Sequence, residues 1–210
     1  MRSILFALAA TLLAAPAVAQ GASQAPAGEY VLDRTHASLE WSGLHAGLSY
    51  YSARFTNFDI KLTFNPADVT KSKVTATIDP KSVETDFLKT RPAGNTEDFN
   101  AMLATGERFF NAGKFPSITF TSTAITKTSD TKGKMTGNLT FLGVTKPVTL
   151  DVTFAGETAS HPFSKVPAIG FSATGTFKRS DFGLDYLLPA IVGDDVKVDI
   201  EGDFIQKVAS

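Results

Sequence analysis

The sequence contains no cysteine, so disulfides, thiolate nucleophiles and cysteine-based metal sites are excluded and packing must hold the fold. Its 20 Lys and Arg nearly balance 21 Asp and Glu. The resulting net charge of −1 gives no electrostatic basis for binding nucleic acid or an anionic membrane. The usual hydrolase, metalloprotease and glycine-rich phosphate-loop motifs are missing. We therefore expect neither an enzyme nor a nucleic-acid-binding protein, and no required cofactor.

The first 19 residues are typical of an export signal. Arg2 supplies a positive charge, an apolar stretch follows from Ile4 to Ala15, and Ala17-Val18-Ala19 is an A-x-A cleavage site. The alternative, a buried N-terminal helix, fits the charge and the cleavage site less well. We predict cleavage after Ala19 and a periplasmic protein. No later apolar run is long enough to predict a transmembrane segment.

The small, polar residues 20–28 predict a disordered leader, and residues 29–208 predict one domain. Within this domain, apolar and polar residues alternate with a period of two, the main signal for β-strands with one solvent-facing side. The shorter runs are 73–79, 118–124, 134–141, 148–154, 169–177 and 196–204. Two longer strands are expected at 29–43 and 48–64. The apolar phase shifts inside the second, which predicts a bulge or bend near Thr56-Asn57.

One segment follows a helical pattern instead. Asn95-Thr96-Glu97-Asp98 is a typical helix start, and Phe99, Met102 and Leu103 follow at helical spacing. Gly106 interrupts this pattern. We predict one or two short helices lying across a barrel mouth or a sheet edge.

About eight antiparallel strands with one apolar face form either a sandwich or a closed barrel. Small residues recur on the apolar face among many of the 17 phenylalanines, which favours a partly empty interior. These small residues are Ala76, Ser122, Ala124, Gly137, Ala173, Gly175 and Gly202. The alternative is that they only make room for neighbouring Phe rings and leave no cavity. We predict an all-β fold, an extended eight-stranded antiparallel barrel, which is wide enough for one small ligand.

The sequence also resembles the YceI family of exported lipid-binding proteins in five ordered segments that span nearly the whole domain. They are D-x-x-H-S at Leu32–Ser38, H-x-G-x-S…R-F…F at His45–Phe58, F-F-x…P-x-I-x-F at Phe109–Phe120, G-x-L-T-x-x-G-V-T-K-P-V at Gly137–Val148 and R-x-D-F-G at Arg179–Gly183. Two positions depart from the pattern: Ala37 separates His from Ser, and Ala53 replaces a glycine. The resemblance implies a lipocalin-like barrel whose hydrophobic tunnel holds a polyisoprenoid or quinone-like lipid.

We expect the following residues to contact such a ligand. The predicted ligand-binding set is Trp41, His45, Arg54, Phe58, Phe64, Phe87, Phe99, Met102, Phe120, Phe141, Phe171 and Phe177. Alternation places most of them on the apolar face, and the helical segment is expected to form a lid. His36 and His45 lack a third ligand at metal-binding spacing, so a hydrogen-bonded structural role or contact with a lipid head is expected instead. For Arg54 and Arg179, the alternatives are an ion pair with Asp33, Asp181 or Asp185, or contact with a ligand head.

The function predicted from these features is a periplasmic carrier for a polyisoprenoid, a quinone-like lipid or a related long-chain amphiphile. Two alternatives remain open: an accessory factor or enzyme acting on an isoprenoid lipid, and a stress-protection or interaction module that uses the barrel surface. The sequence is compatible with a monomer or a homodimer, because edge strands and barrel mouths can pair.

Overall fold

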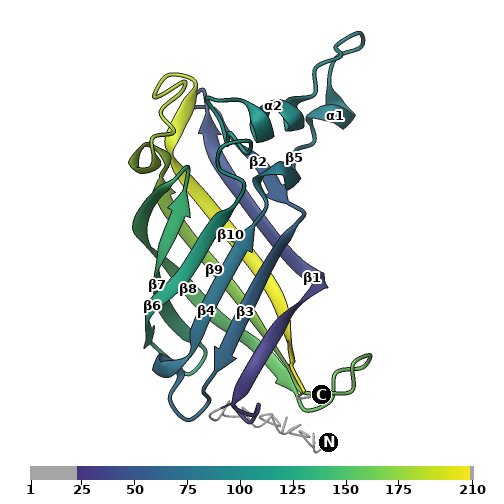
Figure 1. The fold of residues 1–210 in the computed structure, drawn as a ribbon, viewed down its shortest axis with the longest axis vertical. Coiled ribbons are helices and arrows are strands. Elements are labelled where there is room, and N and C mark those ends of the chain that lie inside the picture. The colour runs from purple at the N-terminus through teal and green to yellow at the C-terminus, as the bar shows by residue number, and fades with distance from the viewer. Residues whose placement is uncertain (1–22, 209–210) are drawn as a thin grey trace, which may run out of the picture.

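A computed structural model describes residues 23–208. Its ten strands form one antiparallel sheet that closes on itself (Figure 1). They are β1 (Gly28–His45), β2 (Ser49–Phe55), β3 (Phe58–Phe64), β4 (Lys73–Ile78), β5 (Val83–Glu84), β6 (Ile118–Lys127), β7 (Lys132–Phe141), β8 (Val144–Thr158), β9 (Ala168–Lys178) and β10 (Val192–Gln206). Two short α-helices, α1 (Phe87–Thr90) and α2 (Phe99–Thr105), and three 3-10 turns, η1 (Val69–Lys71), η2 (Pro80–Ser82) and η3 (Arg179–Phe182), complete the described chain.

Eight of the strands make the closed barrel: β1, β3, β4, β6, β7, β8, β9 and β10, with β10 pairing back onto β1. This confirms the predicted fold class. The long strand β1 pairs with β3 through Gly28–Val31 and with β2 through Glu40–His45. Strands β2 and β5 therefore extend the wall at one end beyond the eight-stranded body.

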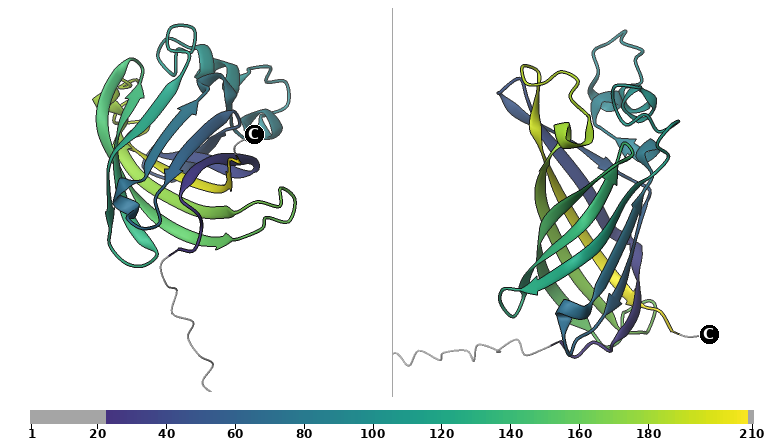
Figure 2. Two further views of the ribbon diagram at one scale, coloured as in Figure 1. Left: turned by 60° about the horizontal axis from the view of Figure 1, so that its bottom comes forward. Right: turned by 60° about the vertical axis from the view of Figure 1, so that its left-hand side comes forward.

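The two ends of the barrel differ (Figures 1 and 2). At one end, called here the helical end, lie α1, α2, the β1–β2 turn and the β9–β10 connection. At the opposite end lie the described N-terminal segment, the C-terminus and the β3–β4, β6–β7 and β8–β9 connections. The short helices predicted from the sequence thus lie at one mouth of the barrel, and their role as a lid stays a prediction.

Several local predictions are confirmed. The break between β2 and β3 falls at Thr56-Asn57, where the apolar phase shifts. The helix start predicted at Asn95-Thr96-Glu97-Asp98 is confirmed: its last residue, Asp98, is the N-cap of α2, and the Asp98 carboxylate accepts a hydrogen bond from the Ala101 amide at 2.9 Å. The same helix ends at Gly106.

The predicted alternation in β6 is wrong after Ser122. A bulge between Ser122 and Ala124 inserts an extra residue, so Ala124 becomes exposed and Ile125 lines the interior. One extra residue in a strand reverses the face of every residue after it. The sequence pattern gave no sign of this insertion, because Ala124 suits either face.

The N-terminal segment also differs from the prediction. Residues 1–22, which include the predicted export signal and cleavage site, lie outside the described residues. We expected residues 20–28 to form a disordered leader, but Ser23, Gln24 and Ala25 all donate hydrogen bonds to Glu157 on β8. Ala25 is buried, and the Tyr30 hydroxyl donates to the Pro26 carbonyl at 2.8 Å. The end of this segment therefore packs onto the barrel.

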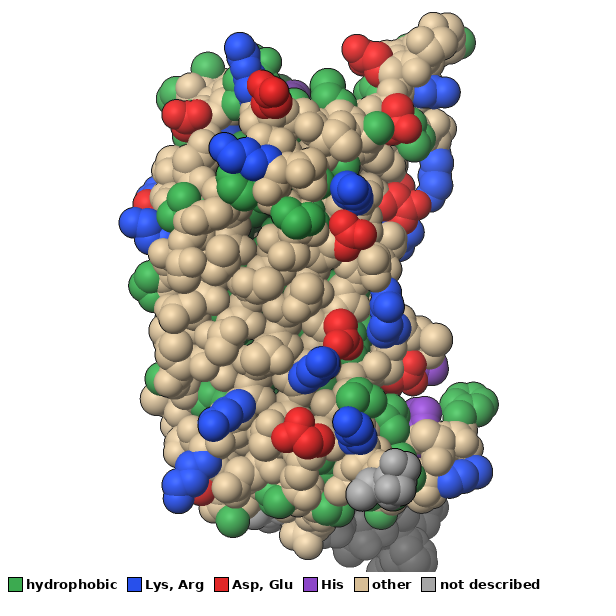
Figure 3. Space-filling model, in the orientation of Figure 1, with side chains coloured by type: hydrophobic (Ala, Val, Ile, Leu, Met, Phe, Trp, Pro, Cys, Tyr) green, Lys and Arg blue, Asp and Glu red, His purple; other side chains and the backbone are tan. Residues whose placement is uncertain are grey.

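The outer surface is polar and mixed in charge. The face in Figure 3 shows Lys, Arg, Asp and Glu scattered among other side chains and backbone atoms, with apolar side chains in small separate groups. Cross-strand pairs such as Thr136–Thr149 and Thr140–Thr145 hydrogen-bond at 2.8 Å. Among residues 23–208, no helix is long and apolar enough to cross a membrane.

Some small residues of the apolar face make room for a neighbouring side chain. A Cβ on Gly137 would lie 2.2 Å from Phe120 Cζ, and one on Gly175 would lie 2.5 Å from Leu150 Cδ2. The alternative interpretation, room for a neighbouring Phe ring, is therefore correct for Gly137, whereas Gly175 makes room for a leucine; the interior as a whole stays hollow.

We predict that Gly137→Ala destabilises the protein by about 1–3 kcal/mol, because the added methyl collides with the Phe120 ring in a packed wall. Urea unfolding measures this change. Gly113→Ala is the matched control, since a Cβ there meets nothing within 4 Å. Equal stability of the two variants would contradict the packing described here.

Candidate ligand-binding cavity

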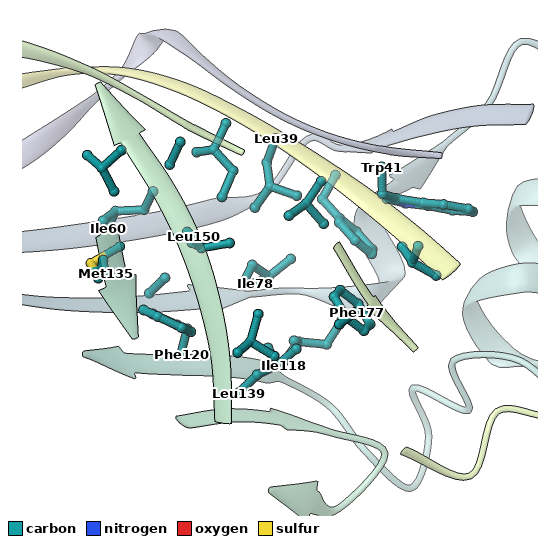
Figure 4. A pocket seen from close by; sticks show the side chains of 18 of the residues that line it. Leu39, Trp41, Ile60, Ile78, Ile118, Phe120, Met135, Leu139, Leu150 and Phe177 are labelled. Atoms are coloured by element: carbon teal, nitrogen blue, oxygen red, sulfur yellow. The ribbon is translucent and has the colours of Figure 1, made fainter. Parts of the chain in front are cut away.

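A cavity of about 820 Å³ occupies the interior of the barrel. Its wall is built almost entirely from inward-facing apolar side chains of the eight barrel strands (Figure 4). It extends from α2 at the helical end to the β6–β7 hairpin at the opposite end, because Met102 and Gly133 both line it. Its size falls within the range of about 300–1,000 Å³ that is usual for small-molecule sites.

The cavity wall changes character along the barrel. Branched aliphatic side chains and Met135 line the middle: Leu39, Ile60, Ile78 and Leu150 (Figure 4), with Ile200 paired opposite Leu39. At the opposite end, Phe171 contacts the rings of Phe64, Phe154 and Phe204, with centroids 5.5–6.3 Å apart. The cavity thus has a mostly aliphatic middle section and an aromatic cluster at this end.

A second aromatic cluster lies at the helical end. Phe110, just after α2, contacts Trp41, Phe55 and Phe141 at 5.9, 5.5 and 5.9 Å between ring centroids. Phe182 and Phe177 extend this cluster, with their ring centroids 5.5 Å apart. Flat rings with few rotatable bonds give a large contact area at low entropic cost.

Ten of the twelve predicted ligand-binding residues line this cavity. They are Trp41, His45, Phe64, Phe87, Phe99, Met102, Phe120, Phe141, Phe171 and Phe177. Contact of these residues with a ligand stays a prediction. His45 lies at the rim and is exposed, whereas Phe87, Phe99 and Met102 come from the two helices as expected for a lid.

Arg54 and Phe58 do not line the cavity, which corrects their predicted placement. The Arg54 side chain is half exposed, and it donates to the Glu84 carboxylate on β5 at 2.6 and 2.9 Å. Its ion-pair partner is therefore none of the three aspartates expected. Phe58 is buried in the core beside the bend between β2 and β3, so its ring serves packing.

Sequence reasoning missed several lining residues at the helical end. Tyr51 shares a face with Phe55 in β2, and the alternation there already indicates an inward position. Phe109, Tyr186 and Leu187 lie in loops, where no periodicity signals their direction. Only the closing of the barrel brings these loops over the same mouth.

Contacts between two of these loops span the helical mouth. The Tyr186 ring packs edge-on against Phe109 at 5.5 Å, and the Arg108 guanidinium lies 5.0 Å from the centre of the Tyr186 ring. These contacts join the segment after α2 to the β9–β10 connection. Side chains of both segments therefore line the cavity at this end.

Arg179 is buried beside this mouth and has a structural role. Its guanidinium donates to the carbonyls of Gly193, Leu184 and Val192 at 2.9, 3.1 and 3.1 Å. Burial lowers the pKa of Arg179 from its ordinary value. The expected ion pair with a nearby aspartate is replaced by backbone acceptors, which fix the β9–β10 connection.

His36 lies outside the cavity, in the stretch of β1 between Leu32 and Ala37 where the register to β10 shifts. Its Nδ1 is 3.0 Å from Asp33 Oδ2, and Thr35 donates to Asp33 Oδ1 at 2.6 Å. Hydrogen bonds from Thr35 and His36 lower the pKa of Asp33 from 3.8 to about 2, and Asp33 raises the pKa of His36. The hydrogen-bonded structural role expected for this histidine is what the geometry shows.

Two polar atoms in the cavity wall have no hydrogen-bond partner, Trp41 Nε1 and Tyr51 Oη. Each is almost fully buried in the side chains around it. A buried donor without a partner typically costs about 1–3 kcal/mol of stability. Among the described residues, no group of three His, Asp or Glu is placed to hold a metal ion.

The sequence profile of the YceI-like domain matches residues 30–204, which is nearly all of the barrel. The chain belongs to the YceI-like family. A UPF0312 protein of Pseudomonas paraeruginosa is 35% identical to it over 184 residues, covering 86% of this chain and 90% of that protein. Protein YceI of Salmonella arizonae is 36% identical over 181 residues, covering 85% of this chain and 88% of that protein.

Several solved structures share the fold. The Campylobacter jejuni YceI protein aligns with a TM-score of 0.63 at 30% identity, covering 79% of this chain and 90% of that one. Burkholderia cenocepacia BcnA aligns with a TM-score of 0.68 at 24% identity, covering 82% and 98%. A Saccharophagus degradans protein described as a polyisoprenoid binding domain aligns with a TM-score of 0.58 at 14% identity, covering 85% and 98%.

We predict that Asp33→Asn lowers the pKa of His36 in this YceI-like protein, because the substitution removes the carboxylate that favours the imidazolium. NMR titration of the His36 ring measures the change. The contribution of His36 to stability is present at low pH and is lost as the pH rises through its raised pKa. The contribution of Asp33 is present above 3.8 and is lost as the pH falls toward about 2. An unchanged His36 titration in the variant would refute the pairing.

Proposed function

We propose that this protein is a periplasmic carrier that holds the tail of a polyisoprenoid, a quinone-like lipid or a related long-chain amphiphile inside the barrel. The observation that carries the proposal is the continuous apolar cavity of about 820 Å³. Its middle section has no charged side chain, so it suits a hydrocarbon chain and offers no general acid or base. We therefore propose binding without catalysis.

The physical gain comes from removing the tail from water. Burial of one CH₂-sized group contributes roughly 0.8 kcal/mol, so a five-carbon isoprene unit gains about 3–4 kcal/mol before costs. Ordering the tail and losing its free translation offset part of this gain. Several buried units leave a favourable balance without any polar contact along the tail.

Two further points support the proposal. The Saccharophagus degradans protein with the same fold is described as a polyisoprenoid binding domain, which at 14% identity supports the fold's suitability for such a ligand. The first 19 residues have the charge, the apolar stretch and the A-x-A site of an export signal. A lipid that leaves a membrane needs a carrier of this kind in an aqueous compartment, since its apolar tail is poorly soluble in water.

We predict that Ala173→Phe reduces the amount of bound lipid severalfold, because Ala173 lines the middle of the cavity and the added ring occupies the space of the tail. The measurement is extraction of the purified protein with organic solvent, followed by mass spectrometry of the extract. Thr174→Phe is the matched control, since Thr174 is the next residue of β9 and is exposed.

The carrier proposal fails if the wild-type protein carries no apolar molecule and binds none when long-chain isoprenoids are offered in dilute detergent. Equal lipid content in Ala173→Phe and Thr174→Phe would place the bound lipid outside the barrel.

A further inference from the structure

The two unpartnered donors of the cavity wall belong to neighbouring residues at the helical end. Trp41 on β1 is paired with Ala53 on β2, and Tyr51 on β2 is paired with Gly43 on β1. The two aromatic residues are therefore diagonal neighbours on the same face of one hairpin, typically about 7–8 Å apart. Gly43, between them on the inner face, adds no side chain to this part of the wall.

Aromatic rings from the α2 segment pack against both residues. The Phe99 ring lies edge-on to Tyr51, with centroids 6.0 Å apart and planes at 89°. The Phe110 ring lies edge-on to Trp41 at 5.9 Å and 80°. A ring face is a weak acceptor compared with an oxygen atom, so an oxygen placed between the hairpin and α2 satisfies these donors far better.

The charged residues around Trp41 and Tyr51 indicate which kind of ligand oxygen can bind there. Arg179 is the cation that lines the cavity nearby, and its guanidinium is already bound by three backbone carbonyls. The lysines among the lining residues, Lys127, Lys132 and Lys134, belong to the β6–β7 hairpin at the opposite end. A phosphate or carboxylate head buried between the hairpin and α2 would meet these neutral donors, because Arg108, the cation at the mouth, is exposed and lies against the Tyr186 ring. Such a buried, unpaired charge is unfavourable.

We propose that Trp41 Nε1 and Tyr51 Oη form the head-group site of this carrier, and that they donate hydrogen bonds to a neutral oxygen acceptor, a carbonyl or hydroxyl, on the ligand. This inference rests on the proposed carrier function. It adds the chemical class of the ligand's head group and the orientation of the ligand in the barrel. The head lies at the helical end beneath α2, and the tail runs through the aliphatic middle section of the cavity toward the opposite end. Phe99 and Phe110 move aside when the head enters.

The test uses three ligands with the same isoprenoid tail: geranylgeraniol, geranylgeranyl diphosphate and the hydrocarbon that lacks the hydroxyl. Each displaces an apolar fluorescent dye from the delipidated full-length mature protein in dilute detergent. The wild type is expected to bind the alcohol about tenfold more tightly than the hydrocarbon, the value of one well-made hydrogen bond. The alcohol is also expected to bind more tightly than the diphosphate.

The variants Tyr51→Phe and Trp41→Phe each remove one donor and keep an aromatic ring. Each is expected to lose most of the preference for the alcohol and to bind the hydrocarbon as the wild type does. Tyr50→Phe is the matched control, because Tyr50 is the next residue along β2 and its side chain is exposed. The empty Tyr51→Phe protein should melt no lower than the empty wild type, since the hydroxyl it loses has no partner.

The outcomes separate the two proposals. Binding of all three ligands with an alcohol preference that Tyr51→Phe and Trp41→Phe leave intact would overturn the head-group site and leave the carrier function standing. A preference for the diphosphate would overturn the neutral acceptor. Failure of every ligand to displace the dye would overturn the carrier function itself.

Discussion

The ladder between β1 and β10 is the interaction on which the cavity depends. It joins the first and last strands of the chain over eleven paired positions, from Tyr30 opposite Gln206 to His45 opposite Val192. Without it, the sheet would have two open edges and its apolar face would have to collapse onto a second layer. Closure instead turns that face inward on all sides and holds the opposite walls apart, so an apolar interior stays hollow.

Much of this architecture follows from the sequence because it rests on periodicity. Alternation in the shorter strands, the phase shift at Thr56-Asn57 and the Asp98 cap are local signals, and the structure follows them. The bulge after Ser122 left no such signal, since an alanine is compatible with either face. Gly137 and Gly175 show a second limit: small residues indicated free space, but at these two positions the space is filled by Phe120 and Leu150.

The site was predictable to the extent that it lies on strands and in the helix. Trp41, Phe64, Phe120 and Phe177 line the cavity because side-chain direction in a strand is fixed by position. Phe109 and Tyr186 meet across the mouth only because two loops, far apart in sequence, end at the same rim. Arg54 shows that a motif alone does not give the role of a residue. Its partner, Glu84, lies in a two-residue strand, which is too short to be predicted from a periodic pattern.

The single tryptophan of the chain lies in the cavity wall. Indole emission shifts in wavelength and intensity with the polarity and the quenching power of its surroundings. No other residue contributes a competing indole signal, so the tryptophan fluorescence of the protein reports on the contents of the barrel. Any change in the occupancy of the barrel can accordingly be followed in real time, on unlabelled protein and without separating bound from free molecules.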